Sequence, residues 1–121
     1  MLDAQYQYIN ELVSLSKQGD TEALMELVQY YRPLVLASIK RCLIREPRLL
    51  TYREDIEQEI YLIIGELVEQ YDETVSLFSY YISTKIDYRI LAKARKLIGK
   101  NTGGAGIEEV QFSNMPEYWE P

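Results

Sequence analysis

Basic and aromatic side chains share one stretch of this chain, between residues 78 and 96. Lys85, Arg89, Lys93 and Lys96 recur every three or four residues, so on a helix they lie on one face. Such a row neutralises phosphates, and nearby aromatic rings offer faces on which unpaired bases stack, for about 1–3 kcal/mol each. The residues that predict a DNA-binding surface are Phe78, Tyr80, Tyr81, Lys85, Tyr88, Arg89, Lys93, Arg95 and Lys96.

A second interpretation of this stretch needs no ligand, because tyrosines often pack in a core and cations are often merely solvated. The two interpretations divide the residues between them. We expect the side of the helix that carries Ile82, Ile86 and Ile90 to face the core. We expect the basic side to contact a ligand.

Acidic side chains form a second set, with eight acids and no base between residues 54 and 73. Two pairs have helical spacing: Glu54 with Glu57, and Glu69 with Asp72. Such pairs are similar to those that hold magnesium in all-helical nucleotide pyrophosphohydrolases. On one continuous helix at about 1.5 Å per residue, Glu57 and Glu69 lie about 18 Å apart, too far to share one cation. That alternative requires the helix to break at Gly65, so we predict no metal and no cofactor.

Other catalytic chemistries have little support. The chain has no histidine, which excludes a nucleophile activated by an imidazole base. Its one cysteine, Cys42, lies on an apolar helical stripe and is expected to be a small buried hydrophobe. Glycines 103, 104 and 106 lack the preceding strand and the following Gly-Lys-Ser/Thr of a phosphate loop. We therefore predict that the protein is not an enzyme.

Size and composition indicate one compact domain of 121 residues, 47% of them hydrophobic. No apolar run is long enough to span a membrane, and the N-terminus does not resemble a signal peptide. These features predict a cytoplasmic protein. The net charge of −6 is distributed in blocks, since residues 32–53 and residues 85–100 each carry six bases and one acid. Blocks of opposite sign indicate faces with different partners.

The apolar spacing predicts four helices that together form an all-α, compact bundle. They are expected over residues 3–17, 21–44, 52–71 and 75–98. Pro33 is expected to kink or split the second helix, Gly19 and Gly99 to end the first and fourth, and Asp20 to cap the second. A loop is expected around Pro47, and a turn at residues 72–74. The helical domain should cover residues 1–100, followed by a flexible acidic tail over residues 101–121.

Three stretches, in this order, resemble conserved region 2 of bacterial RNA polymerase sigma factors of the sigma-70 family. The first is "GDTEALMELVQYYRPLVLASIKR", the second "REDIEQEIYLIIGELVEQYD" and the third "FSYYISTKIDYRI". The second is the most specific, because family members read Asp-Leu-x-Gln-Glu, an apolar run and then Phe-Asp. The resemblance covers roughly residues 15–100 and implies a bundle of about four helices.

The resemblance implies that Asp55, Gln58 and Glu59, with Ile56 beside them, contact the clamp coiled coil of the polymerase's largest subunit. An acidic face that meets a basic coiled coil gives fast, salt-sensitive docking. It also implies that Phe78, Tyr81 and the neighbouring cations capture flipped bases of the non-template strand of a −10-type promoter element and hold its backbone. Capture in pockets repays the few kcal/mol that flipping costs.

Two departures from the family limit the prediction. Primary members carry a Trp-Trp pair where this chain has Thr84 and Lys85. The family's second module, which reads the −35 element, has no counterpart in these 121 residues. The alternatives are a split factor completed by a second small protein, a reduced factor of a phage or mobile element, or a polymerase-binding regulator that competes with sigma factors.

The last 21 residues carry four acids, no base and four large apolar side chains, Phe112, Met115, Tyr118 and Trp119. Their charge is opposite to that of the basic stretch. The alternatives for these side chains are docking on the body of the protein and docking on a partner. One hypothesis is that the tail folds back on the basic helix and screens it from DNA until polymerase binds; otherwise it is a linker or a contact for a partner.

Overall fold

The computed structural model describes residues 4–102, and the backbone in this range is helical apart from short connections. The elements are α1 (Ala4–Lys17), α2 (Thr21–Arg45), the 3₁₀ helix η1 (Pro47–Tyr52), α3 (Arg53–Gln58), α4 (Ile60–Gln70) and α5 (Phe78–Thr102). The predicted all-α fold is confirmed. Most of the predicted tail lies outside the described residues.

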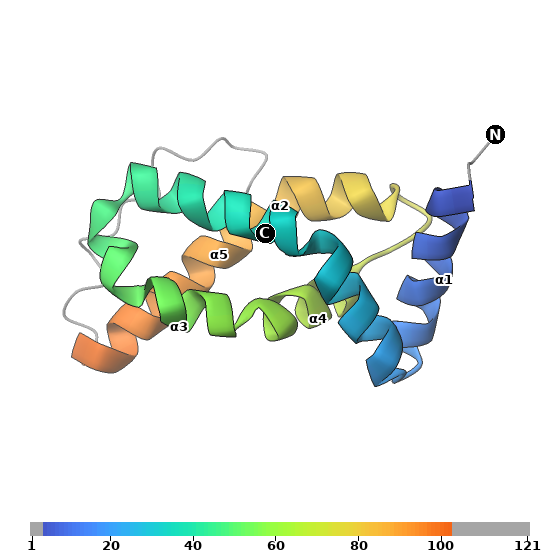
Figure 1. Cartoon of the computed structure of the whole chain (residues 1–121), viewed down its shortest axis with the longest axis horizontal. Coiled ribbons are helices and arrows are strands. Elements are labelled where there is room, and N and C mark those ends of the chain that lie inside the picture. The colour runs from blue at the N-terminus through green and yellow to red at the C-terminus, as the bar shows by residue number, and fades with distance from the viewer. Residues whose placement is uncertain (1–3, 103–121) are drawn as a thin grey trace.

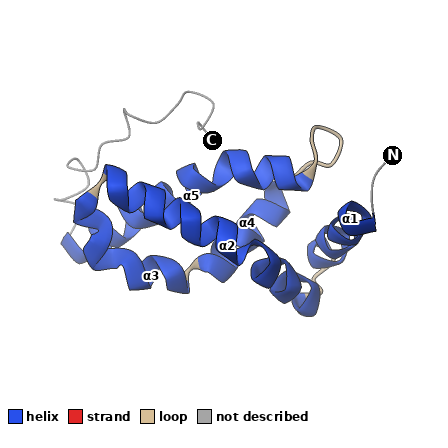
Figure 2. Cartoon of the chain, turned by 45° about the horizontal axis from the view of Figure 1, so that its top comes forward, coloured by secondary structure: helices blue, strands red, loops and turns tan. Residues whose placement is uncertain are grey.

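The long helix α2 is the centre of the arrangement, since it packs against α1, α4 and α5. Figure 1 shows α3 and α4 following one another along one edge, and α1 at one end of the molecule. Only short loops join the helices between residues 4 and 102, and no strand occurs there (Figure 2). No helix in this range is long and apolar enough to cross a membrane.

The core is built from the apolar stripes that the sequence predicted. Ile82, Ile86 and Ile90 of α5 are fully buried, as expected. They pack in one cluster with α2 and α4 side chains, among them Leu27, Val35, Ile39, Ile63, Ile64 and Leu67. Burying each such side chain contributes about 1.5–3 kcal/mol relative to leaving it exposed. This cluster fixes the positions of α4 and α5, which carry the candidate site.

The connection between α1 and α2 follows the predicted signals. Gly19 has φ of 99°, which suits glycine at a helix end, and the Asp20 carboxylate accepts a hydrogen bond from the Ala23 amide at 3.1 Å. Pro33 lies inside α2, which remains one helix from Thr21 to Arg45. Figure 1 shows that α2 changes direction along its length, as a proline that removes one backbone donor allows.

Four predictions about local structure were wrong. The third predicted helix is interrupted at Glu59, where the Glu59 amide donates to Ile56 at 3.0 Å in a 3₁₀-like turn, and not at Gly65. The expected loop around Pro47 is the helix η1. Helix α5 begins at Phe78 and not at Val75, since residues 75–77 belong to the connection that precedes it. The helix also continues past Gly99, where it was expected to end. Its packing outweighs the weak helix propensity of one glycine.

Candidate nucleic-acid interface

A hollow lies where the end of α4, the connection over residues 71–77 and the start of α5 meet. Its volume is about 730 Å³, and its lining residues are Gln70, Asp72, Val75, Ser76, Tyr80, Tyr81, Thr84 and Lys85. A second hollow of about 210 Å³ is lined by Leu67, Gln70, Tyr81, Lys85, Tyr88 and Arg89. The two share Gln70, Tyr81 and Lys85, so they form one groove between α4 and α5. We call it the tyrosine groove.

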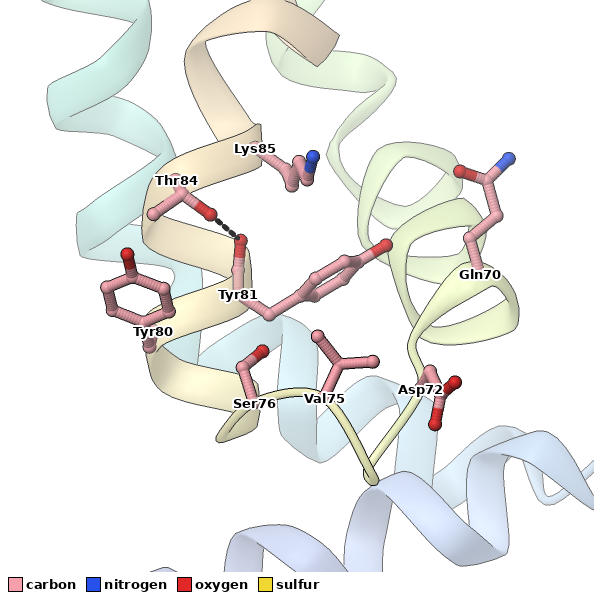
Figure 3. Close-up of a pocket in the computed structure, with 8 residues that line it drawn as sticks. All are labelled: Gln70, Asp72, Val75, Ser76, Tyr80, Tyr81, Thr84 and Lys85. Carbon is pink, nitrogen blue, oxygen red and sulfur yellow. Dashed lines mark hydrogen bonds between the residues drawn. The ribbon is translucent and has the colours of Figure 1, made fainter. Parts of the chain in front are cut away.

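The tyrosine groove presents aromatic and cationic groups from one side of α5. Figure 3 shows the Tyr81 ring pointing from α5 into the space beside α4, with Lys85 and Gln70 directed toward the same space. Tyr80 projects on another side of α5 and is 63% exposed. The Thr84 hydroxyl donates to the Tyr81 carbonyl oxygen at 2.9 Å, so this side chain is satisfied within its own helix.

A cluster of aromatic rings forms the floor under Tyr81. The Tyr81 ring lies 5.2 Å from that of Tyr71 and 6.1 Å from that of Phe78, and Tyr31 packs edge-on against Phe78 at 5.5 Å. Such pairs add about 0.5–1.5 kcal/mol each beyond their burial. Burial raises the pKa of Tyr81 and of Tyr71.

Phe78 was predicted to contact DNA, but its side chain is 0% exposed and belongs to this floor. Its role in the structure is to hold the Tyr81 ring in place. Phe78 and Tyr81 are three residues apart and therefore lie on the same face of the helix. The sequence alone does not show which of the two rings is buried and which reaches the surface.

The connection before α5 is held from several sides. The Tyr71 hydroxyl donates to the Ser76 carbonyl oxygen at 2.7 Å, and the Lys17 ammonium of α1 donates to the Tyr71 carbonyl. The Asp72 carboxylate accepts from the Thr74 hydroxyl at 2.6 Å and from the Thr74 amide at 2.9 Å. These hydrogen bonds lower the pKa of Asp72, and the bond from the Thr74 hydroxyl contributes more than the bond from the amide. The predicted turn at residues 72–74 is confirmed, and it forms one end of the groove.

The predicted cations of α5 fall into three groups. Lys93 is 14% exposed in its side chain and lies 3.3 Å from a Glu66 oxygen, and Arg89 donates to Gln70 and lies 4.0 Å from Glu66. Lys85 lines both parts of the groove, and within residues 4–102 no acidic side chain pairs with it.

The other two predicted cations, Arg95 and Lys96, are exposed beyond the groove. Tyr88 lines the smaller hollow. Of the predicted residues, the structure thus brings Tyr80, Tyr81, Lys85, Tyr88 and Arg89 together around one groove.

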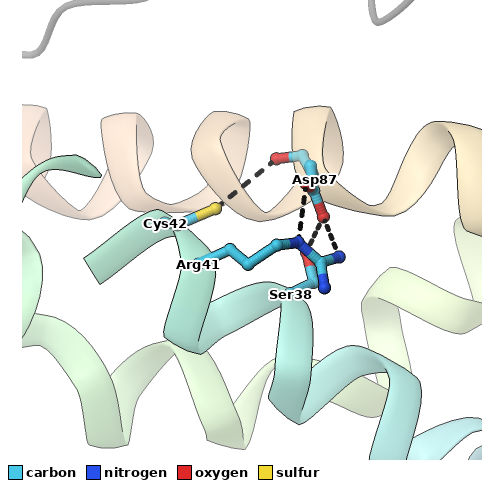
Figure 4. A network of polar contacts seen from close by, with 4 residues as sticks. All are labelled: Ser38, Arg41, Cys42 and Asp87. Atoms are coloured by element: carbon cyan, nitrogen blue, oxygen red, sulfur yellow. Dashed lines mark hydrogen bonds and ion pairs between the residues drawn. The ribbon is translucent and has the colours of Figure 1, made fainter. Parts of the chain in front are cut away.

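A buried polar contact on the opposite side of the same helix was missed by the sequence analysis. Asp87 is 4% exposed and accepts from Arg41 of α2 at 2.8 and 3.2 Å and from the Ser38 hydroxyl (Figure 4). The hydrogen bond with Asp87 raises the pKa of Arg41. Asp87 is the single acid among residues 85–100 and adjoins Ile86 of the buried stripe. This position could have indicated a buried acid with a basic partner.

Cys42 belongs to the same seam between α2 and α5. Its thiol lies 3.9 Å from the Asp87 carbonyl oxygen, and burial raises its pKa to about 12. The thiol is therefore neutral at physiological pH. Its placement agrees with the predicted buried hydrophobe.

The residues predicted to dock on polymerase lie around the break between α3 and α4. Asp55 and Gln58 are exposed, and Glu59 is partly exposed with one carboxylate oxygen that is buried and has no hydrogen-bond partner. Ile56 is 1% exposed and packs in the core, so it fixes α3 from below and is not on the surface. Leu62, one turn into α4, is exposed and was not predicted.

The acidic pairs considered for magnesium do not converge. Glu57 forms an ion pair with Arg53 at 2.9 Å, and Glu69 and Asp72 lie at the far end of α4. Between residues 4 and 102, no three His, Cys, Asp or Glu side chains are placed to hold one metal ion.

Comparison with protein families finds one match: residues 10–72 match a helix-turn-helix domain. No curated protein and no solved structure matches the chain. The matched segment runs from α1 to the turn after α4 and is acidic, with seven bases and twelve acids. Residues 73–102 lie outside it and contain six bases and two acids. The cationic side of the groove is therefore contributed by the helix that follows the matched segment.

Proposed function

We propose that this chain, which belongs to the helix-turn-helix domain family of DNA-binding modules, acts in transcription initiation as a sigma region 2-like protein. The family supports DNA binding, and the sigma-like role rests on the resemblance of the three stretches described above. In this proposal it binds core RNA polymerase and holds single-stranded DNA of a −10-type promoter element. The polymerase performs the chemistry, and the chain itself catalyses nothing. A second small protein supplies any contact with a −35 element.

The tyrosine groove is the observation that carries this proposal. Its larger hollow, about 730 Å³, has room for an extruded base against Tyr81, and Tyr80 offers a second exposed ring on the same turn of α5. Stacking on aromatic side chains is worth about 1–3 kcal/mol per base and is tolerant of sequence. Lys85 is placed to meet a phosphate, because it lines both hollows and has no acidic partner in the described part of the chain.

The exposed side chains of α3 support the polymerase-binding half of the proposal. Asp55 and Gln58 are exposed on α3, whose buried Ile56 holds the short helix in position. Leu62 is exposed in the first turn of α4, which follows α3, and provides apolar contact area. A partner with basic side chains around an apolar strip, such as the clamp coiled coil, suits this combination.

The DNA half is tested by the affinity of the full-length protein for a fluorescein-labelled single-stranded oligonucleotide. Tyr80→Ala is expected to weaken binding about five- to a hundredfold, from the stacking energy of one base. Tyr8→Ala removes an exposed tyrosine of α1 and is the control, with no expected loss. Equal affinities of the wild type and Tyr80→Ala would refute stacking of a base on this exposed ring at the edge of the groove.

The polymerase half is tested separately by binding to purified core enzyme. Asp55→Asn removes one charge from α3 without changing its shape, and Glu22→Gln is the matched control on α2. We expect Asp55→Asn alone to weaken binding, and the difference to shrink as salt is added. Failure of core enzyme to bind the wild type at low ionic strength would remove this half of the proposal.

The runner-up function is a polymerase-binding regulator that occupies the same docking site without opening DNA. One observation favours it: Lys93 is engaged with Glu66 and Phe78 is buried, so fewer residues are available to DNA than the resemblance implies. Replacing Lys93, Arg95 and Lys96 by alanine distinguishes the two. A sigma-like protein loses promoter-dependent transcription while it still binds polymerase, whereas a regulator keeps its inhibitory effect.

A further inference from the structure

We infer that the segment Glu117–Glu120 of this chain binds in the tyrosine groove and competes there with nucleic acid. The inference concerns regulation of the proposed site, and its biological meaning rests on the proposed function. The contact itself does not, since it can be measured without DNA.

The chemistry of the groove favours such an occupant. Three cations line this side of α5 or adjoin it, Lys85, Arg89 and Lys93, and Glu66 is the acid that faces the last two. Asp72 also lines the larger hollow, and its carboxylate accepts hydrogen bonds from Thr74. Lys85 and the rings of Tyr80 and Tyr81 are left for an occupant. An occupant that combines negative charge with flat apolar groups fits such a surface.

The sequence of the proposed occupant suits this surface. It reads Glu-Tyr-Trp-Glu, two aromatic rings between two carboxylates. A short piece of single-stranded DNA offers the same combination, with bases as rings and phosphates as charges. Residues 101–121 contain no base that would oppose binding to cations.

The chain between α5 and the segment Glu117–Glu120 is long enough for the segment to reach the groove. Helix α5 runs from Phe78 to Thr102, so its last residue lies about 26 Å along the axis from Lys85, at about 1.5 Å per residue. The fifteen residues from 103 to 117 span at most about 50 Å. A coil of that length has a root-mean-square end-to-end distance of about 21 Å. Because this is close to the required span, the effective local concentration of the segment is high.

The test uses the single tryptophan of the chain, Trp119, as a probe of the segment. In the full-length protein without DNA, we expect quenching of Trp119 fluorescence by acrylamide to be weaker than in Lys85→Glu. Lys40→Glu makes the same charge change at an exposed position of α2 and should leave quenching unchanged. Circular dichroism shows whether each variant keeps its helices.

Charge reversal provides a rescue. Glu117→Lys with Glu120→Lys should expose Trp119 to quencher, and combining both with Lys85→Glu should restore at least part of the protection. Equal quenching in the wild type and Lys85→Glu would overturn the inference. Protection that disappears on dilution would also overturn it, because the occupant would then be a second copy.

The DNA arm separates this inference from the proposed function. Glu117→Gln with Glu120→Gln should raise affinity for single-stranded DNA about three- to tenfold, because an intramolecular competitor is weakened. Trp119 protection without any DNA binding supports the contact and refutes the DNA function. DNA binding with an unprotected Trp119 refutes the contact and leaves the function standing.

Discussion

Helix α5 has polar residues on two sides, and the structure uses the two sides differently. Toward α2, Asp87 is buried and accepts hydrogen bonds from Arg41 and Ser38, so its carboxylate is saturated. Toward α4, Tyr81 and Lys85 line an open groove. A saturated buried acid fixes one packing arrangement, and an unsaturated, exposed surface is left for a ligand. Polarity alone does not distinguish them, whereas burial and hydrogen-bond partners do.

The largest expected effect on the free energy of unfolding concerns the aromatic rings of the groove. It tests whether the buried Phe78 supports the fold while the exposed Tyr80 does not. Phe78→Ala should lower the free energy of unfolding by about 3–5 kcal/mol, because it empties a fully buried site. Tyr80→Ala, two residues away and exposed, should change it by no more than about 0.5 kcal/mol. Urea denaturation of both variants measures the difference. Similar losses for the two would mean that Tyr80 is part of the core and not of a ligand surface.

The next effect concerns the seam with α2. Asp87→Ala should cost about 1–3 kcal/mol, because the Ser38 hydroxyl and the Arg41 guanidinium lose their acceptor. Arg41 is half exposed and can turn to water, which keeps the loss below that of a fully buried pair.

A double-mutant cycle of Asp87→Ala and Arg41→Ala isolates their coupling. A coupling energy near zero would show that Asp87 acts through Ser38 alone. The affinity for single-stranded DNA is measured at temperatures where the Asp87→Ala variant is folded. An unchanged affinity would show that the side of α5 that faces α2 and the side that lines the groove are independent.

A smaller effect is a dependence of stability on alkaline pH. The pKa of Cys42 is raised by burial from 9.0 to about 12, so the unfolded chain releases this proton first. The stabilisation is complete below pH 9 and is lost as the pH rises toward 12, at no more than about 1.4 kcal/mol per pH unit.

Buried tyrosines also lose stabilisation as the pH rises. Comparison with Cys42→Ala isolates the contribution of the thiol, because this variant keeps the tyrosines. Its free energy of unfolding should fall less steeply over this range than that of the wild type. Parallel curves would place the thiol in contact with water and would contradict the closed seam between α2 and α5.

Periodicity and cap chemistry predicted most of the fold. The buried stripe Ile82, Ile86 and Ile90 was correct to the residue, and so was the cap at Asp20, because each depends on local spacing. The break at Glu59 was missed because neither glycine nor proline marks it. The apolar stripe continues through the break, since Ile56 and Ile60 are both buried on either side of it.

The candidate site was predictable in composition and less so in geometry. A run of rings and cations indicated the helix, but which ring is floor and which is surface depends on packing against Tyr31, far away in the sequence, and against Tyr71, which lies outside the helix. The contribution of Gln70 to the groove depends likewise on how α4 crosses α5. Long-range packing of this kind leaves no periodic signal in the helix itself.

The smallest expected effect on stability should be the most informative about the open side of α5. Glu66 contacts Lys93 at 3.3 Å and Arg89 at 4.0 Å on a partly exposed surface, so Glu66→Gln should cost no more than about 1 kcal/mol. The same change releases both cations toward the groove. Affinity for single-stranded DNA should therefore rise, and the dependence of log Kd on log salt should steepen, because more counterions are released.

Glu69→Gln, an exposed acid one turn further along α4, is the matched control. An unchanged salt dependence for Glu66→Gln would show that Lys93 and Arg89 serve the fold alone, which would make this side of α5 as structural as the side that holds Asp87.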